Sequence, residues 1–387
     1  MQAQHSKLIM DFITQQLADF SVPSLILFSL LIVVTLIQLY QLIFVQLRLA
    51  RYPIKTKEIG DKNPISVIVY ARNHAAYLEK NIPEWLSQED VIFELVLVND
   101  CSWDDTEDLL RSLAVTYPQV KIVNVPIDDR FRRTKKYALT LGIKAAQYEQ
   151  ILFIEADYLP RSKKWIAHMQ ANFTEHTALV LGYVPFPVGA SFSTLLTRFD
   201  HFMTALYSLS FAIKGKAFSG YGQNIAFTKT IFFAGKGYAS HMHLTYGETD
   251  FFINQHATRK NTRVEINPAS HVLTDKKQSY AQFVKDKFTR MDTLKLFTLG
   301  NRLRLHVGVY TAVLFYLISV GLLILGFSWP VVLGIYLFRL FLQYAVYFKI
   351  AKRLKHPNIQ WAMPILEPIY LLQSMVLRAV YLIQNKS

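Results

Sequence analysis

The sequence predicts an α/β domain with a mostly parallel sheet, flanked by transmembrane helices. Strand-like and helix-like segments alternate from residue 62 to about residue 300, which is the pattern of a doubly wound parallel sheet. Long apolar runs lie on both sides of this region. Hydrophobic residues make up 52% of the chain and charged residues 18%, too apolar for an ordinary soluble enzyme and too polar for an all-membrane bundle.

The first apolar run covers residues 24–47 and carries no charge. A helix of this length crosses a bilayer, because each residue adds about 1.5 Å. The run starts too late and is too long for a signal peptide, and it lacks a basic leader. We therefore predict a short N-terminal segment over 1–23, a transmembrane helix over 24–47 and a basic linker over 48–61.

The alternating region predicts a domain over residues 62–302. Its expected strands are short runs rich in β-branched residues, at 65–72, 93–100, 120–126 and 151–157. Its first expected helices lie at 78–88, 104–117 and 135–148. Pro83 should mark a break or the first turn of the first of these helices. Residues 191–213 are apolar and aromatic, which fits a buried core helix and an interfacial helix equally well.

The remaining residues, 303–387, are predicted to form a C-terminal membrane region. Two apolar runs at about 306–328 and 330–350 are long enough to span a bilayer. A third run at about 361–383 is interrupted by Glu367 and Arg378, so it either spans the membrane or lies in its interface.

The positions of the charges predict the topology. Basic residues follow the first run closely, at Arg48, Arg51, Lys55 and Lys57. The positive-inside rule then places the middle domain in the cytoplasm of a multi-pass membrane protein, most simply at a bacterial inner membrane. The net charge of +14 suits contact with anionic membrane lipids. We expect no nucleic-acid partner, because no recognition motif accompanies this charge.

An acidic turn ends the fourth expected strand. The segment "ILFIEADYLP" (151–160) places Glu155 and Asp157 after an apolar run, where parallel sheets bind their ligands. The chain has no glycine-rich phosphate loop, so a nucleotide diphosphate would need another counter-charge. Carboxylates that hold Mg²⁺ or Mn²⁺ would supply it. Taken alone, the two carboxylates also fit an ordinary capped turn.

Four segments in this order carry a resemblance to a known family: "ISVIVYARN", "LVLVNDCSWDDT", "KKYALTLGIKAA" and "ILFIEADYLP". Together they resemble the inverting membrane glycosyltransferases of the GT-A fold, the group that includes cellulose, hyaluronan and ceramide-glucosyl synthases. The resemblance covers residues 62 to about 300. It implies transfer of a sugar, with inversion, from a cytosolic nucleotide-sugar to a lipid-linked or glycan acceptor of the cell envelope. It also implies dependence on Mg²⁺ or Mn²⁺.

The resemblance and the strand ends together assign candidate residues. The donor-binding candidates are Asn73, Asp100, Lys135, Asp157, Lys287 and Arg290. The metal candidates are Asp157 and Glu155, of which Asp157 is the better ligand because Glu155 replaces the first aspartate of the family's pair. The segment "SGYGQNIAFTK" (219–229) resembles the acceptor loop and assigns Gly222 and Asn224 to acceptor binding. The segment "GETDFF" (247–252) resembles the segment that carries the catalytic base, for which Asp250 is the first candidate and Glu248 the second.

Three positions depart from the family pattern: Thr249 replaces the middle acid of the base motif, and Asp286 and Thr289 replace Gln and Arg before the C-terminal spans. These departures leave an alternative open, a non-catalytic glycosyltransferase-like membrane subunit that binds the donor or a partner chain. A channel or transporter is disfavoured, because the spans are few and show no inverted repeat. The pair His241 and His243 fits a transition-metal site or an ordinary loop.

Overall fold

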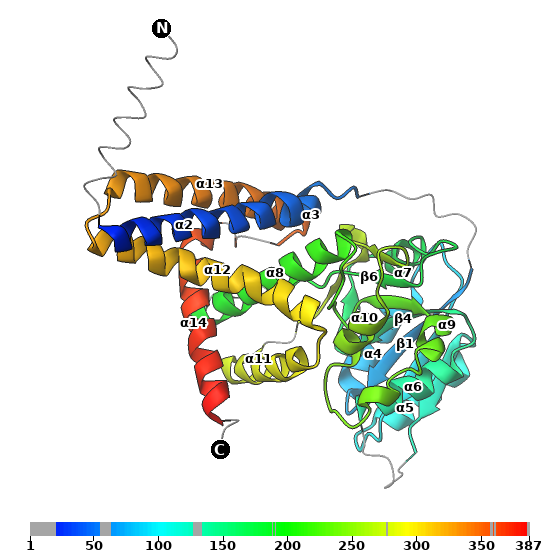
Figure 1. The fold of residues 1–387 in the computed structure, drawn as a ribbon. Helices are drawn as coiled ribbons and strands as arrows, with labels where there is room; N and C mark the ends of the chain where they lie inside the picture. Colours follow the sequence, from blue (N-terminus) through cyan, green and yellow to red (C-terminus); the bar gives the residue numbers. More distant parts are fainter. Residues whose placement is uncertain are drawn as a thin grey trace.

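The computed structural model describes residues 21–54, 63–126, 134–187, 189, 191–275, 278–356, 359 and 361–384. Most of the predicted segment over 1–23 lies outside these residues, as does part of the linker over 48–61. The described residues form an α/β domain beside a group of long apolar helices, with two further helices between the two parts (Figure 1). These two are α8 (Phe192–Ile213) and α11 (Tyr280–Lys295).

A seven-stranded sheet forms the centre of the α/β domain, in the order β3-β2-β1-β4-β7-β6-β8. The strands are β1 (Ile65–Ala71), β2 (Phe93–Asn99), β3 (Val120–Asn124), β4 (Gln150–Glu155), β6 (Leu179–Leu181), β7 (Ile225–Thr228) and β8 (Thr262–Val264). Only β7 runs antiparallel to its neighbours, and the other pairings are parallel. The predicted α/β class with a mostly parallel sheet is therefore confirmed. A short second sheet pairs β5 (Leu159–Pro160) with β9 (Val272–Leu273).

Both faces of the sheet are covered, which explains why its strands are apolar on consecutive residues. On one face α4 (Ala75–Leu86), α5 (Thr106–Thr116) and α7 (Trp165–Gln170) pack on alternate residues of β1, β2 and β4. On the other face α6 (Lys135–Ala145) and α8 pack on the remaining residues. The expectation for Pro83 was wrong, because α4 continues through it. The carbonyl that loses its donor there belongs to Glu79, an exposed residue that water can reach.

Four shorter elements complete the domain before α11. They are α9 (Lys229–Ala234), α10 (Glu248–His256) and two 3₁₀ turns at Ala239–His241 and Pro268–Ser270. The helix α8 lies between the sheet and the apolar helices, and most of its residues are buried. Of the two interpretations of residues 191–213, the structure favours the core helix.

Four described helices are long and apolar enough to cross a membrane, judged by length and composition. The first is a continuous helix from Val22 to Arg51, composed of α2 (Val22–Gln41), a π-helical turn (Leu42–Gln46) and α3 (Leu47–Arg51). The others are α12 (Leu299–Ile324), α13 (Trp329–Arg353) and α14 (Met363–Gln384). In Figure 1, α2, α12 and α13 run together, whereas α14 crosses them and continues toward α11.

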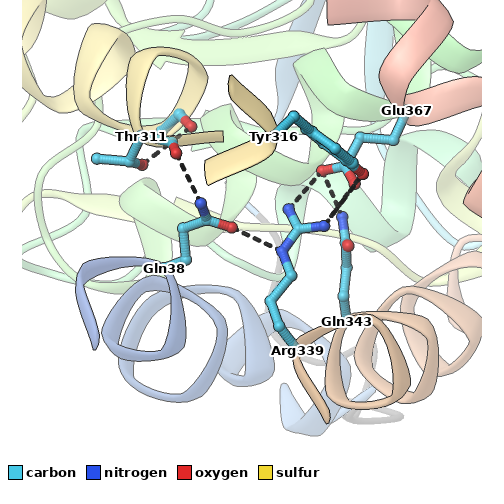
Figure 2. Close-up of polar contacts among 7 residues, drawn as sticks. Gln38, Thr311, Tyr316, Arg339, Gln343 and Glu367 are labelled. Atoms are coloured by element: carbon cyan, nitrogen blue, oxygen red, sulfur yellow. Dashed lines mark hydrogen bonds and ion pairs between the residues drawn. The ribbon is translucent and has the colours of Figure 1, made fainter. Parts of the chain in front are cut away.

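A buried polar network joins all four of these helices (Figure 2). Arg339 of α13 donates two hydrogen bonds of 2.8 Å to Glu367 of α14, and its Nε donates to Gln38 of α2 at 2.7 Å. Gln38 in turn donates to the carbonyl of Thr311 in α12 at 2.8 Å. Tyr316 and Gln343 also donate to Glu367. The acid that interrupts the last apolar run is therefore fully paired inside the helix group.

We expect the Glu367→Leu variant to lose about 3–5 kcal/mol of stability, because it leaves the Arg339 guanidinium buried without a counter-charge. The measurement is thermal unfolding in detergent, with the double variant Arg339→Met plus Glu367→Leu as the matched control. The double variant should regain most of the loss, because no unpaired charge remains. An equal loss in both variants would show that packing at Glu367, not its charge, holds α14 in place.

Candidate active site

A cavity of about 610 Å³ lies beyond the carboxyl end of β4, facing α8 and α11. Its polar lining includes the predicted residues Glu155 and Asp157 on the sheet side and Lys287 and Arg290 on α11. Asp200 of α8 lies beside the two cations. The structure thus brings residues of the β4 end and of α11, about 130 positions apart in the sequence, into the lining of one cavity.

The acidic pair is positioned by β4, whose last residue is Glu155, while Asp157 follows in the turn and is buried. One oxygen of Glu155 accepts hydrogen bonds from Lys135 at 2.5 Å and from Gln223 at 3.2 Å. Within the described part of the chain, no group of three or more His, Cys, Asp or Glu residues could hold a metal. Two carboxylates nevertheless fit Mg²⁺ or Mn²⁺ when substrate phosphates supply further oxygen ligands. The pair therefore fits a cation that is shared with a substrate.

Lys135, the first residue of α6, lies between two carboxylates. Its ammonium contacts Glu155 and also Glu248 at 3.1 Å. Burial alone would lower the pKa of Lys135, but the two carboxylates outweigh this effect and raise it well above the ordinary value. Burial likewise opposes ionisation of Glu248, yet Lys135 keeps the pKa of Glu248 below its ordinary value. Lys135 thus links the acidic pair to one of the two candidate bases.

The predicted nucleoside side of the site lies at the ends of β1 and β2, next to β4. Asp100 is buried and accepts a hydrogen bond from Tyr70 at 2.7 Å. Asn73 has a left-handed backbone with φ of 55°, and its side-chain oxygen accepts from the amide of Trp103. Lys135 lies 5.4 Å from the centre of the Tyr70 ring, so this group adjoins the acidic pair. Asparagine adopts this left-handed conformation more readily than most non-glycine residues.

The two candidate bases begin α10. Asp250 accepts a hydrogen bond of 2.6 Å from Ser219, and burial raises the pKa of Asp250. Gly222 touches the same segment, since a Cβ there would lie 2.6 Å from the hydroxyl of Thr249. The glycine therefore lets the predicted acceptor loop approach the base segment closely.

Asn224, the second predicted acceptor residue, is completely buried. Its amide accepts from Trp165 at 3.0 Å and donates to the carbonyls of Tyr183 and Ser270 at 3.0 and 2.9 Å. Any direct contact with an acceptor would require these bonds to break. The structure places Asn224 where it fixes the start of β7 and with it the loop that carries Gly222.

Asp200 is a site residue that the sequence reasoning missed. It forms an ion pair with Lys287, and Arg290 lies 3.8 Å from its other oxygen. Burial opposes ionisation of Asp200, but the two cations keep its pKa below the ordinary value. An acid within the apolar run 191–213 was a usable signal, because such a residue needs a buried partner.

The family model described as Glycosyl transferase family 2 matches residues 66–234. These residues form a glycosyl transferase family 2 domain. The resemblance inferred from the four sequence segments, including the GT-A fold, is thereby confirmed.

Proteins similar to this chain include a sequence relative and a protein of solved structure. The putative teichuronic acid biosynthesis glycosyltransferase TuaG of Bacillus subtilis (strain 168) is 24% identical over 137 residues, which cover 35% of this chain and 52% of TuaG. The matched part is thus about half the length of that relative. The mannosyltransferase PcManGT from Pyrobaculum calidifontis, solved in complex with GDP-Man and Mn²⁺, has a TM-score of 0.55 at 16% identity. The comparison covers 87% of this chain and 98% of PcManGT, so the shared fold extends beyond the family 2 domain.

Lys136, next to Lys135 in the family 2 domain, was also missed. Its buried ammonium donates to the backbone carbonyls of His241, Leu244 and Tyr246 at 2.8, 2.9 and 2.6 Å. These three bonds hold the loop that leads into α10 and the candidate bases. The side chain of His241 is buried, and burial lowers its pKa to about 4, which keeps the imidazole neutral. The loop is therefore organised around Lys136.

We expect the Lys136→Met variant to lose at least about 10²-fold in transfer rate while its donor affinity changes little. The substitution keeps most of the side-chain volume but leaves three carbonyls without a donor, so the loop before α10 should shift. Donor affinity by calorimetry and rate by product formation separate the two effects. Lys144→Met, on the last turn of the same helix, is the matched control. Equal losses of affinity and rate would contradict a role confined to the base segment.

Proposed function

We propose that this chain is a membrane glycosyltransferase that moves a sugar from a nucleotide-sugar to an acceptor, with inversion and with a divalent cation. The observation that carries the proposal is a cavity lined both by Glu155 and Asp157 of the family 2 domain and by the cations Lys287 and Arg290 of α11. A cation held on carboxylates and basic side chains around the oxygens both stabilise the charge of a sugar diphosphate. The bound GDP-Man and Mn²⁺ named for PcManGT support a donor and a cation of these classes.

The proposed donor contacts follow the strand ends. Asn73 and Asp100 would bind the nucleoside, and Asp157 with Glu155 would hold Mg²⁺ or Mn²⁺. When bound, this cation would offset charge on the departing diphosphate. Lys287 and Arg290 would contact the same oxygens, and Asp200 positions both cations before the donor arrives. Lys135 would lie beside the diphosphate, and its ammonium favours the ionised form of Glu248.

Inversion requires a base on the face of the sugar opposite the leaving group. Asp250 is the preferred candidate, because its raised pKa suits a proton acceptor and it accepts a hydrogen bond from the neutral Ser219 hydroxyl. Glu248 is the second candidate, but its pairing with Lys135 stabilises the ionised carboxylate and weakens it as a base. Gly222 would border the acceptor, and Asn224 would keep its loop in place.

The proposed acceptor is a lipid-linked or glycan molecule of the cell envelope, reached at the cytoplasmic face of a bacterial inner membrane. The cavity borders α8 and α11, which pack on α14. Basic residues lie at the domain-side ends of two candidate spans, at Arg48 and Arg51 of α3 and at Lys352 and Arg353 of α13. Arg353 contacts the carbonyl of Tyr52, so these ends are adjacent. By the positive-inside rule they support a cytoplasmic domain.

The test is a transfer assay with purified protein in detergent, a broad panel of nucleotide-sugars and a lipid extract as the acceptor source. We expect release of nucleoside diphosphate and a glycosylated product with one donor in Mn²⁺ or Mg²⁺, and neither in EDTA. If no donor on the panel is transferred or hydrolysed, the proposed activity fails.

A second candidate is a non-catalytic membrane subunit that binds the donor or a partner chain. It is favoured by Thr249 in place of an acid and by Asp286, an acid in place of glutamine that accepts hydrogen bonds from Gln278 and Gln282. Calorimetry would then detect donor binding without turnover. Transfer that appears only after a partner chain is added would select this candidate.

A further inference from the structure

A second group of cations lies outside the cavity, where α12 and α14 meet. Arg302, His306 and Tyr310 follow one another at four-residue spacing, so they share one face of α12. The guanidinium of Arg378 on α14 lies 5.3 Å from the centre of the Tyr310 ring, and the His306 and Tyr310 rings are 5.5 Å apart. We refer to Arg302, His306, Tyr310 and Arg378 as the α12–α14 cluster.

The two arginines of the α12–α14 cluster have no counter-charge among the described residues. No described acid forms an ion pair with Arg302 or Arg378, and both side chains are exposed. The guanidinium groups of both arginines interact electrostatically with the His306 imidazole. By contrast, Lys287 and Lys295 of the neighbouring α11 each have an aspartate partner. Cations gathered in this way repel one another, and a bound anion relieves that repulsion.

Exposed apolar surface begins directly beside the α12–α14 cluster. On α12 the exposed large apolar side chains continue along one stripe, at Leu303, Val307, Leu314 and Leu317. On α14 they include Met375, Val376 and Leu382. The surface therefore offers exposed cations next to exposed apolar side chains, on two helices that are apolar enough to span a membrane. A phospholipid has the matching arrangement, with an anionic phosphate attached to acyl chains.

We propose that the α12–α14 cluster binds the headgroup phosphate of an anionic phospholipid, with an acyl chain along the exposed stripe of α12. Guanidinium groups match phosphate geometry, and basic pockets between helices at the cytoplasmic side bind anionic headgroups. Stacking on Tyr310 holds Arg378 in place, which lowers the cost of ordering it when the phosphate binds.

The bound lipid would also stabilise the position of α14 beside the active site. Tyr381, three residues beyond Arg378, donates to Asp292 of α11, and its ring packs on Phe288 of the same helix. The helix α11 carries Lys287 and Arg290 into the cavity. A lipid phosphate bound by α12 and α14 would therefore be connected to the cavity cations through two packed helices. The helix α14 contacts α11 at Tyr381, and α11 carries Lys287 and Arg290.

The test is lipid binding by native mass spectrometry on the full chain in a neutral detergent. The probes are phosphatidylglycerol and phosphatidylcholine of equal chain length. We expect the wild type to prefer phosphatidylglycerol, and the double variant Arg302→Gln plus Arg378→Gln to bind it about 25-fold more weakly, since each cation contributes about five-fold. The matched control is Lys349→Gln plus Lys352→Gln, which removes two exposed cations from the neighbouring α13 and should change affinity less than about two-fold.

Three results would overturn the proposal. Equal binding of the two lipids by the wild type would show that the headgroup charge is not recognised, and this result needs no variant. Equal loss in the α13 control would show that general surface charge attracts the lipid. Displacement of phosphatidylglycerol by millimolar inorganic phosphate would assign the α12–α14 cluster to a soluble phosphate ligand instead.

Discussion

We expect the Asp157→Ala variant to lose sugar transfer by more than about 10³-fold and to lose the cation dependence of donor binding. The Asp157 carboxylate is buried at the wall of the cavity, next to Glu155. Without it the acidic pair keeps one carboxylate, one oxygen of which already accepts from Lys135. Removal of a single preorganised charge-stabilising group typically costs about 10²–10³-fold in rate, and here the cation would be lost as well. Calorimetry of the donor with and without Mn²⁺, together with the transfer assay, measures both losses.

The controls separate the cation from general effects of charge. Asp157→Glu should keep part of the Mn²⁺-dependent binding, because a carboxylate remains on a longer arm. Asp275→Ala, which removes an exposed acid paired with Lys80, should leave both measurements unchanged. Residual donor binding in Asp157→Ala is expected from Lys287 and Arg290. Normal turnover of Asp157→Ala in the presence of EDTA would rule out the metal role.

The parallel half of the fold was predictable because its strands are buried on both faces. The expected strands at 65–72, 93–100 and 151–157 begin at or next to the observed starts of β1, β2 and β4. A continuous apolar run between polar residues needs no knowledge of its partners to be recognised. The other half of the sheet was not predicted. Its strands β6, β7 and β8 have three or four residues each, and they become strands only through pairing with distant segments.

The candidate site was likewise predictable only in part. Residues at strand ends could be predicted, because parallel strands present their carboxyl ends at one edge of the sheet. The contacts of the basic side chains could not be predicted, although Lys135 itself was a donor-binding candidate. Lys135 and Lys136 are adjacent in the sequence, but consecutive residues of a helix point about 100° apart. One ammonium therefore contacts Glu155 and Glu248, while the next holds the loop before α10.

Because burial raises the pKa of Asp250, the proposed mechanism also predicts a pH dependence. A base acts in its ionised form, so the rate should fall as the pH drops through the pKa of Asp250. This acid limb should lie at higher pH than for an ordinary aspartate, since the pKa is raised. The acid limb should be absent from the pH–rate profile of the residual activity in a variant that lacks the Asp250 carboxylate.

If Asp250 accepts the proton of the acceptor, Asp250→Asn should lower the catalytic rate by about 10²–10⁴-fold and leave donor affinity nearly unchanged. The change is almost isosteric and can keep the contact with Ser219, and the proposed donor contacts lie elsewhere, at Asp100 and the acidic pair. Glu248→Gln should have a smaller effect, because Lys135 retains its contact with Glu155. Rate measurements at saturating donor, paired with calorimetry, compare the two variants directly.

Other results of this comparison would identify a different base or a non-catalytic protein. If Glu248→Gln is the more damaging change, the longer carboxylate has taken over the task of the acid that Thr249 replaces, and Lys135 serves as its charge partner during proton transfer. If neither variant alters the rate of an active enzyme, the base lies outside residues 247–252. If the wild type is inactive and Thr249→Asp confers transfer, the non-catalytic alternative is correct. Gly222 makes that last variant informative, because the side chain at position 249 already contacts the predicted acceptor loop.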